Sequence, residues 1–214
     1  MSDQALDSAR RALRRDRSLY PFAKRALDVG SAGAGGLLLL PVALGIAAAI
    51  RWSSPGPILF RQVRAGRGGR PFGLYKFRTM RVGARSDAAG KVHVDAPIAA
   101  DDPAITPLGR WLRRYGLDEI PQILNVLRGD MSLVGPRPTI PEQVAAYTAW
   151  ERRRLEVLPG ITGLAQVSGR NNLPWPERIR LDIDYVDSRS FREDLRLLGL
   201  TFRRVFLERT LHDE

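Results

Sequence analysis

Two adjacent carboxylates, Asp118 and Glu119, have the residue types and spacing most suited to chemistry in this chain. Pro121 follows them, and proline is tolerated in the first turn of a helix, so the pattern predicts a helix that opens at Asp118 as its N-cap. The helix dipole would keep a carboxylate there ionised, and the free N–H groups beside it would accept a phosphate. Asp118 is therefore a candidate nucleophile toward phosphorus, and Glu119 could bind a divalent ion or transfer a proton. A purely structural cap is the alternative for Asp118.

Arg137 lies between two prolines in the Gly-Pro-Arg-Pro segment at 135–138. The prolines restrict the backbone on both sides, so the guanidinium would be presented to an anion at little entropic cost. A rigid turn with a solvated arginine is the alternative. Two weaker signals follow. A glycine-rich stretch that ends at Arg170 suits a phosphate or nucleotide, and Asp182 and Asp184 could each orient an arginine or a metal or be solvated.

The composition restricts which other chemistry is available. The chain has 214 residues, enough for one domain, and no cysteine, which excludes disulfides, thiolate nucleophiles and cysteine-ligated metals. Its two histidines, His93 and His212, are far apart, which argues against a multi-histidine metal site or a histidine-dependent triad. Lys and Arg number 34 against 23 Asp and Glu, a net charge of +11, so an anionic partner is expected, with phosphate as the first candidate.

The elements that must position these residues have recognisable signals. Residues 108–115 have helical spacing, and Gly116 is a stop signal. Strands near 58–63 and 72–79 are expected to form a hairpin around the glycine-rich turn at 66–69. Residues 82–107 lack periodicity and predict a loop. The segment 190–210 predicts an amphipathic helix, either packed on the core or lying on a membrane.

Residues 29–50 form an uncharged, largely apolar segment, 22 residues long, which as a helix of about 33 Å would just cross a bilayer. Basic residues flank it on both sides, so a spanning helix would place one basic flank outside, against the positive-inside tendency. A signal peptide is disfavoured because the segment begins well inside the chain. Pro41 predicts a kink near Leu40, and a re-entrant helix would keep both flanks against anionic lipid headgroups. We favour that form over a helix buried in a soluble core.

Several long motifs occur in order along the chain: KRALD, SPGPILFRQ, YKFRTM, LDEIPQILNVLRGDMSLVGPRP, PGITGLAQVSGR and LDIDYV. Over residues 22–206 the chain resembles the small monotopic phosphoglycosyl transferases of the bacterial sugar transferase family. The resemblance implies transfer of a phosphosugar from a UDP-sugar to polyprenyl (undecaprenyl) phosphate. UMP would be released, and a membrane-linked glycan such as an exopolysaccharide would be started.

The resemblance also implies roles for particular residues. Asp118 matches the family's nucleophile, which forms a covalent phosphosugar intermediate, and Glu119 matches its acidic partner. Mg²⁺ assists at this dyad, with Asp118 as the expected metal ligand. The candidates for binding substrate or its phosphates match family positions near the site: Lys76, Arg78, Arg137, Arg170 and Asp182.

The implied fold is α+β, mainly helical with a small β-hairpin, and monotopic on the cytoplasmic face of the bacterial inner membrane. We expect a basic interfacial segment at 1–25, a Pro-kinked re-entrant membrane helix at 26–52 and a cytoplasmic catalytic domain at 53–214. Expected partners are a UDP-sugar, polyprenyl phosphate and anionic membrane lipids, and no nucleic acid. The sequence does not specify the sugar, the glycan or the oligomeric state.

Two functions of other classes are also open. A basic nucleic-acid-binding protein would explain the charge, yet the chain has no recognised reading motif and such a protein has no use for the apolar segment. A non-catalytic scaffold on the membrane surface would explain both features but leaves Asp118, Glu119 and Arg137 without a role.

Overall fold

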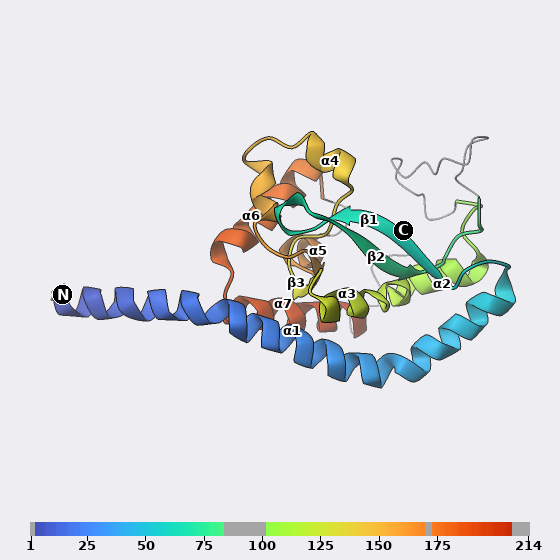
Figure 1. Ribbon diagram of the computed structural model, residues 1–214, viewed down its shortest axis with the longest axis horizontal. Coiled ribbons are helices and arrows are strands. Elements are labelled where there is room, and N and C mark those ends of the chain that lie inside the picture. The colour runs from blue at the N-terminus through green and yellow to red at the C-terminus, as the bar shows by residue number, and fades with distance from the viewer. Residues whose placement is uncertain (1–2, 84–101, 170–172, 207–214) are drawn as a thin grey trace.

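The computed structural model describes residues 3–83, 102–169 and 173–206. The long helix α1 (Asp3–Ser53) comes first and continues through Pro21 and Pro41. In Figure 1 its N-terminal part extends away from the other elements, and its later part bends beneath them without a break in the helix. The expected boundary between residues 25 and 26 is therefore not a break in secondary structure.

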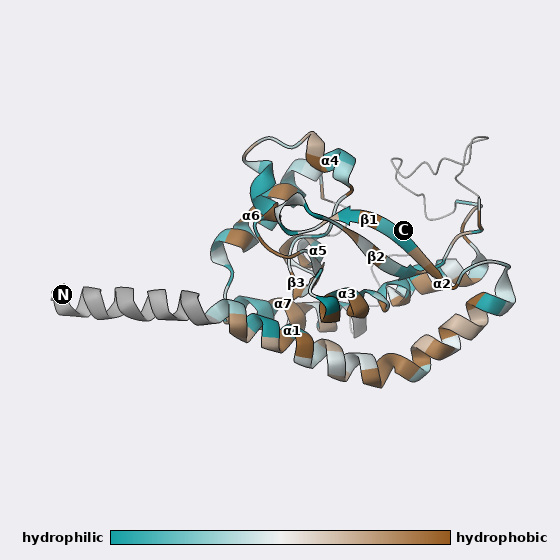
Figure 2. Cartoon of the chain, in the orientation of Figure 1, coloured by the Kyte–Doolittle hydropathy of each residue, from teal (hydrophilic) through white to brown (hydrophobic). Residues whose placement is uncertain are grey.

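Most of the apolar part of α1 is not covered by protein. The stretch Tyr20–Ser53 contains an 18-residue window of mean hydropathy 2.1, of which 11% is buried. Figure 2 shows brown turns along much of this part, with pale turns between them and teal turns near its two ends. By length and composition the helix is a candidate membrane anchor. Its re-entrant passage stays a prediction.

The other elements are shorter than α1. They are β1 (Leu59–Ala65), η1 (Arg67–Gly69), β2 (Pro71–Phe77), α2 (Pro107–Tyr115), η2 (Leu117–Glu119), α3 (Gln122–Arg128), β3 (Ser132–Val134), α4 (Pro141–Ala145), η3 (Glu151–Leu155), β4 (Gly160–Thr162), α5 (Leu164–Ser168), α6 (Trp175–Ser188) and α7 (Phe191–Phe206). The described chain is thus mainly helical with a small hairpin, as predicted. The predicted loop at 82–107 lies mostly outside the described residues, as does His93.

Two small sheets connect the helices. Strands β1 and β2 are antiparallel, with Leu59 opposite Phe77, and the turn between them places Gly68 and Gly69 at positive φ, which favours glycine. The predicted hairpin is confirmed, with its strand ends shifted by one or two residues. Strands β3 and β4 pair in parallel, with Ser132 opposite Gly160. The sequence analysis did not predict this second sheet.

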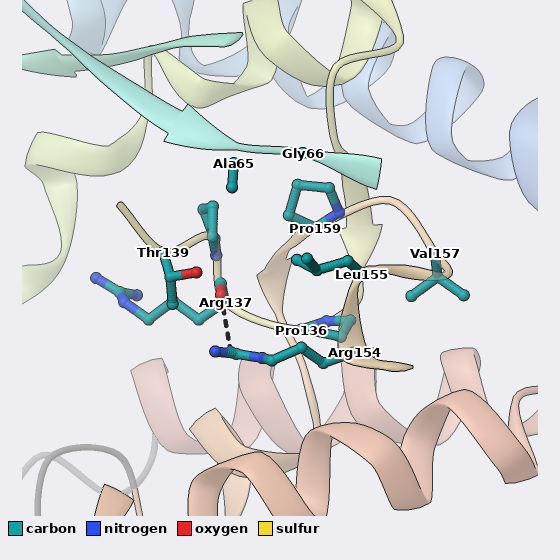
Figure 3. Close-up of a pocket in the computed structure, with 10 residues that line it drawn as sticks. Ala65, Gly66, Pro136, Arg137, Thr139, Arg154, Leu155, Val157 and Pro159 are labelled. Carbon is teal, nitrogen blue, oxygen red and sulfur yellow. Dashed lines mark hydrogen bonds between the residues drawn. The ribbon is translucent and has the colours of Figure 1, made fainter. Parts of the chain in front are cut away.

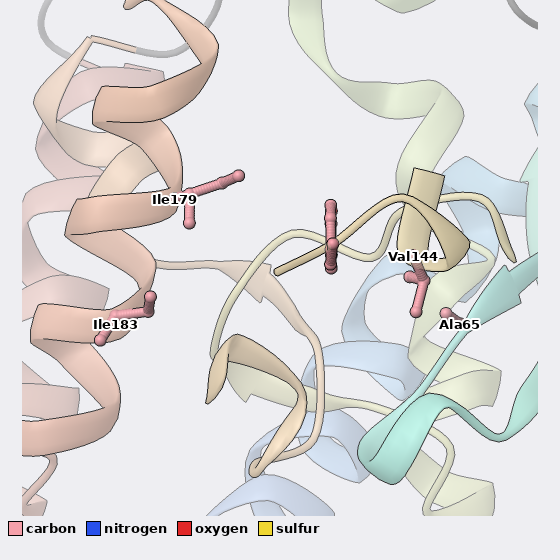
Figure 4. Close-up of a cluster of buried hydrophobic side chains, with 5 residues drawn as sticks. Ala65, Val144, Ile179 and Ile183 are labelled. Atoms are coloured by element: carbon pink, nitrogen blue, oxygen red, sulfur yellow. The ribbon is translucent and has the colours of Figure 1, made fainter. Parts of the chain in front are cut away.

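Several small apolar clusters form the core. One joins the end of β1 to α4 and α6 through Ala65, Val144, Tyr147, Ile179 and Ile183 (Figure 4). Two others contain residues of α1: Ala32 packs with Leu74, Val126 and Met131, and Ile46 and Ile50 pack with Phe77 and Leu112. The long helix is therefore packed onto the hairpin and onto α2 and α3 at two separate places.

Candidate active site

Asp118 and Glu119 lie in η2, a 3-10 turn between α2 and α3. Helix α2 ends at Gly116, whose φ is 68°, and the N–H of Glu119 then donates to the carbonyl of Gly116 at 3.2 Å. Helix α3 begins only at Gln122, after Pro121. The prediction that Asp118 is the N-cap of a helix is therefore wrong, because the glycine reverses the chain and the tighter i→i+3 turn comes before the α-helix.

Asp118 is nearly buried, with 8% of its surface exposed. Burial raises the pKa of Asp118, and the positive charge of Lys76 opposes this change while the negative charge of Glu119 adds to it. This rise in the pKa of Asp118 is opposite to the effect expected of a helix dipole, which would keep the carboxylate ionised, because loss of solvation has the larger effect here. A buried carboxylate with a raised pKa beside charged groups is a common feature of functional sites.

Glu119 is held by two of the predicted cations. Its Oε1 accepts hydrogen bonds from Nζ of Lys76 at 2.8 Å and from Nη2 of Arg137 at 2.9 Å. Burial would raise the pKa of Glu119, but the charges of Arg137 and Lys76 together outweigh it and lower the pKa to about 2. The two neighbouring carboxylates thus have pKa values shifted in opposite directions, an arrangement that suits two different roles.

Lys76 reaches the dyad because α3 is bonded to strand β2. Asn125, which is fully buried, donates from Nδ2 to the carbonyl of Gly73 at 2.7 Å and accepts at Oδ1 from the N–H of Tyr75 at 3.0 Å. These two bonds fix the strand that carries Lys76 relative to the helix that follows η2. The sequence analysis missed Asn125, although an asparagine within an apolar helix was a signal for such a bond.

Arg137 follows β3, in a turn that packs tightly against β4. A Cβ atom on Gly160 would lie 2.1 Å from the backbone nitrogen of Gly135, so only glycine permits this approach. The N–H of Gly160 donates to the carbonyl of Pro136 at 2.8 Å. The glycine-rich stretch therefore holds the Pro-Arg-Pro turn in place through close backbone packing.

Asp182 lies behind this turn and does not contact the dyad. It is 2% exposed and forms an ion pair with Arg154 of η3. Arg154 donates in turn to the backbone carbonyl of Arg137 at 3.0 Å, as Figure 3 shows, and to the hydroxyl of Tyr147 at 2.6 Å. Burial raises the pKa of Asp182 to about 6, and Arg154 opposes this change. In this arrangement Asp182 positions Arg137 through Arg154, which confirms the alternative that Asp182 orients an arginine; a contact with substrate stays a prediction.

Arg78 is not brought to the dyad. Arg78 is 7% exposed and donates to the carbonyl of Ser54 at 2.7 Å and to that of Pro55 at 3.0 Å. Its bonds therefore hold the chain at the end of α1, a structural role in place of the expected phosphate contact. Arg170 lies outside the described residues.

An open pocket of about 290 Å³ is lined by both cations that bind Glu119. It is lined by three cations together with one amide and three small or apolar residues: Arg64, Lys76, Arg137, Gln122, Leu74, Pro138 and Gly160. Three positive side chains around one opening favour an anionic ligand such as a phosphate. Arg64 and Gln122 were not predicted from the sequence. Nothing local distinguishes Arg64 from its neighbours Arg61 and Arg67.

The dyad fits an Mg²⁺ site that the protein shares with substrate phosphates. Among the described residues, no three acidic or histidine side chains gather at one point. Mg²⁺ is, however, commonly bound by one or two carboxylates together with substrate phosphates and water. Asp118 fits such a shared site better than Glu119, whose Oε1 already accepts from two cations.

Known sugar transferases are similar to this chain over most of its length. The family model of the bacterial sugar transferases matches residues 19–208. The uncharacterized sugar transferase EpsL of Bacillus subtilis is 46% identical over 160 residues, which are 75% of this chain and 75% of EpsL. The exopolysaccharide production protein ExoY of Rhizobium meliloti is 35% identical over 202 residues, 90% of this chain and 89% of ExoY.

A longer relative matches over only part of its length. The UDP-glucose:undecaprenyl-phosphate glucose-1-phosphate transferase of Escherichia coli is 40% identical over 197 residues, which are 88% of this chain and 41% of that protein. The shorter relatives, in contrast, are matched over most of their length. Because the family model covers nearly the whole chain and includes every predicted site residue, the chain belongs to the bacterial sugar transferase family.

Proposed function

We propose that this chain transfers a phosphosugar from a UDP-sugar to polyprenyl phosphate, releases UMP and thereby starts the synthesis of an exopolysaccharide or related glycan. The names of several relatives supply the two substrate classes, a UDP-sugar and undecaprenyl phosphate. The observation that carries the proposal is the buried Asp118, whose neighbour Glu119 is bonded to two of the three cations that line one pocket. This is the arrangement that attack on a diphosphate requires.

In the proposed reaction a carboxylate oxygen of Asp118 attacks the phosphorus that bears the sugar. The bond from this phosphorus to the bridging oxygen breaks, and UMP leaves with the electron pair. An oxygen of polyprenyl phosphate then attacks the same phosphorus, and the carboxylate of Asp118 is released as the second leaving group. Each step exchanges one phosphorus–oxygen bond for another, so atoms and charge balance.

The cations lower the electrostatic cost of this reaction. A carboxylate and a diphosphate repel each other, and Lys76 and Arg137 supply positive charge where they approach. Glu119 keeps both cations in place through the bonds to its Oε1. We propose Asp118 as the protein ligand of Mg²⁺, which when bound supplies further charge neutralisation at the donor phosphates.

We also propose that α1 enters and leaves the membrane on one face, the cytoplasmic face of the bacterial inner membrane. The same domain holds both ends of the apolar segment. Near its start, Arg25 donates to the carbonyl of Val126 at 2.6 Å, and Asp28 accepts from the N–H of Leu133 at 3.0 Å.

Near the other end of the segment, Ile50 packs in a cluster with Phe77 and Leu112, and Arg78 bonds to Ser54. A folded domain can hold both ends only if they lie on the same side of the bilayer. The exposed apolar residues between them, such as Leu38 at 80% exposed, would then lie among lipid chains.

The activity is tested with the purified full-length chain in lipid nanodiscs. Undecaprenyl phosphate, Mg²⁺ and a panel of UDP-sugars are supplied, and UMP release is measured. We expect UMP release with at least one sugar, loss of release in Asp118→Asn, and normal release in Asp184→Asn, a matched change at an exposed aspartate. Without the lipid acceptor, intact-mass analysis should find a phosphosugar adduct on Asp118. Turnover of Asp118→Asn at the wild-type rate would reject the assignment of the nucleophile.

A further inference from the structure

Arg64 is the one cation of the pocket that the proposed mechanism does not use. It lies in β1 and lines the opening together with Lys76 and Arg137. Its Nη2 donates to Oε1 of Gln62 at 2.6 Å, which fixes one edge of the guanidinium. Its Nε is buried and has no hydrogen-bond partner among the described residues. Since buried donors are almost always paired, this orphaned N–H points to a partner outside the protein chain.

The charge of Arg64 is also unfavourable in the unliganded protein. Burial lowers the pKa of Arg64 to about 10, and repulsion from Arg137 adds to this, while Glu119 and Glu142 oppose it. Lys76 and Arg137 are each paired directly with Glu119, whereas no carboxylate in the described part of the chain lies within ion-pair distance of Arg64. Arg64 is partly buried, and a partly buried cation without a paired anion weakens the fold, a penalty that an anionic ligand would reduce.

We propose that Arg64 is a third cationic ligand for phosphate oxygens in this pocket, and that it binds the diphosphate of the nucleotide-sugar donor. This inference rests on the proposed function for the identity of the donor. The phosphate of the lipid acceptor offers the same chemistry, and the experiment below separates the two sources.

The test compares Arg64→Gln with Arg61→Gln, a matched control on the same strand. Three positions separate the two residues, so their side chains point to opposite faces of β1, and Arg61 is exposed. Binding of inorganic pyrophosphate to the full-length protein in nanodiscs is measured by calorimetry, without turnover. Loss of a hydrogen bond to a charged group predicts about 10- to 100-fold weaker binding in Arg64→Gln. We expect Arg61→Gln to bind like the wild type.

Steady-state kinetics identify the phosphate. We expect Arg64→Gln to raise KM for the UDP-sugar about 10- to 100-fold and to leave KM for undecaprenyl phosphate unchanged. A rise confined to the lipid phosphate would overturn the donor assignment while supporting a phosphate contact. Arg64→Lys, which keeps the charge but has no Nε–H, should fall between Arg64→Gln and the wild type, and it carries the test if Arg64→Gln fails to fold.

Two results would overturn the inference. One is equal pyrophosphate affinity in the wild type and Arg64→Gln. The other is an equal loss in Arg61→Gln, which would indicate general attraction by the basic surface. Failure of the proposed function looks different: the wild type would bind pyrophosphate in an Arg64-dependent way but release no UMP with any UDP-sugar.

Discussion

Replacing Glu119 with glutamine removes the carboxylate that Lys76 and Arg137 share while it preserves the shape of the side chain. The pKa of Glu119 falls from 4.5 to about 2 in the folded protein. At about 1.4 kcal/mol per pKa unit, this corresponds to about 3 kcal/mol in favour of the ionised form. The side chain of Arg137 is 54% exposed, so solvent screening reduces the expected loss in free energy of unfolding to about 1–2 kcal/mol.

The loss in stability caused by Glu119→Gln should become smaller as the pH falls. Because folding lowers the pKa of Glu119, its contribution is fully present above about pH 4.5 and declines as the pH falls toward 2. We therefore expect Glu119→Gln to lower the melting temperature by about 2–8 °C at pH 7, with a smaller difference at pH 3. Thermal unfolding in nanodiscs, followed by intrinsic fluorescence, measures both values.

Two further variants make this experiment specific. A double-mutant cycle with Lys76→Met should show non-additive losses, because the two side chains share one hydrogen bond. Glu177→Gln is the matched control, since among the described residues Glu177 has only a long, exposed contact, with Arg180, and its effect should stay within about 0.5 kcal/mol. The reasoning is refuted if Glu119→Gln is as stable as the wild type at pH 7, or if its loss is the same at pH 3 and pH 7.

Three further predictions test other parts of the structure. Because burial raises the pKa of Asp118, the acid limb of UMP release should lie above the ordinary aspartate range of about 3.9, and a rate that stays flat down to pH 4 would contradict this. Gly160→Ala should cost at least about 2 kcal/mol of stability through its clash with backbone, whereas Gly30→Ala, in open space on a helix, should be neutral or stabilising. Single cysteines replacing the exposed Phe22 and Trp52 should both react with an impermeant maleimide in inverted membrane vesicles and neither in spheroplasts, while labelling from opposite sides would reject the re-entrant proposal.

Local patterns in the sequence predicted several elements correctly. The hairpin followed from apolar strands around glycines that adopt positive φ, and the end of α2 followed from Gly116, whose φ is 68°. The amphipathic segment at the C-terminus is helical, as α7. Each of these features depends on residues within one or two turns of each other, so their signals are visible without the fold.

Asp118 marks where local reasoning failed. The pattern of an acid before a proline predicted a helix cap and a carboxylate kept ionised by a dipole, but the chain makes a 3-10 turn there and burial raises the pKa. Arg78 was likewise expected to bind substrate, and the structure bonds it to the end of α1. Asp182 pairs with Arg154, which was one of the alternatives given for it, although the sequence did not indicate which arginine. Burial and long-range pairing are set by how elements pack, which spacing along the chain does not encode.

The sequence alone determined the residue types at the dyad, the order of the motifs and the presence of an apolar helix. These features depend only on neighbouring residues and short periodicities, so they do not require knowledge of the fold. Only packing decided that Lys76, Glu119 and Arg137 meet at one oxygen atom, and that Arg64 faces the same opening. Packing also brought both ends of the apolar segment onto one domain. These contacts join residues far apart in the chain, and their energies depend on distance and solvent exposure, which exist only once the elements have come together.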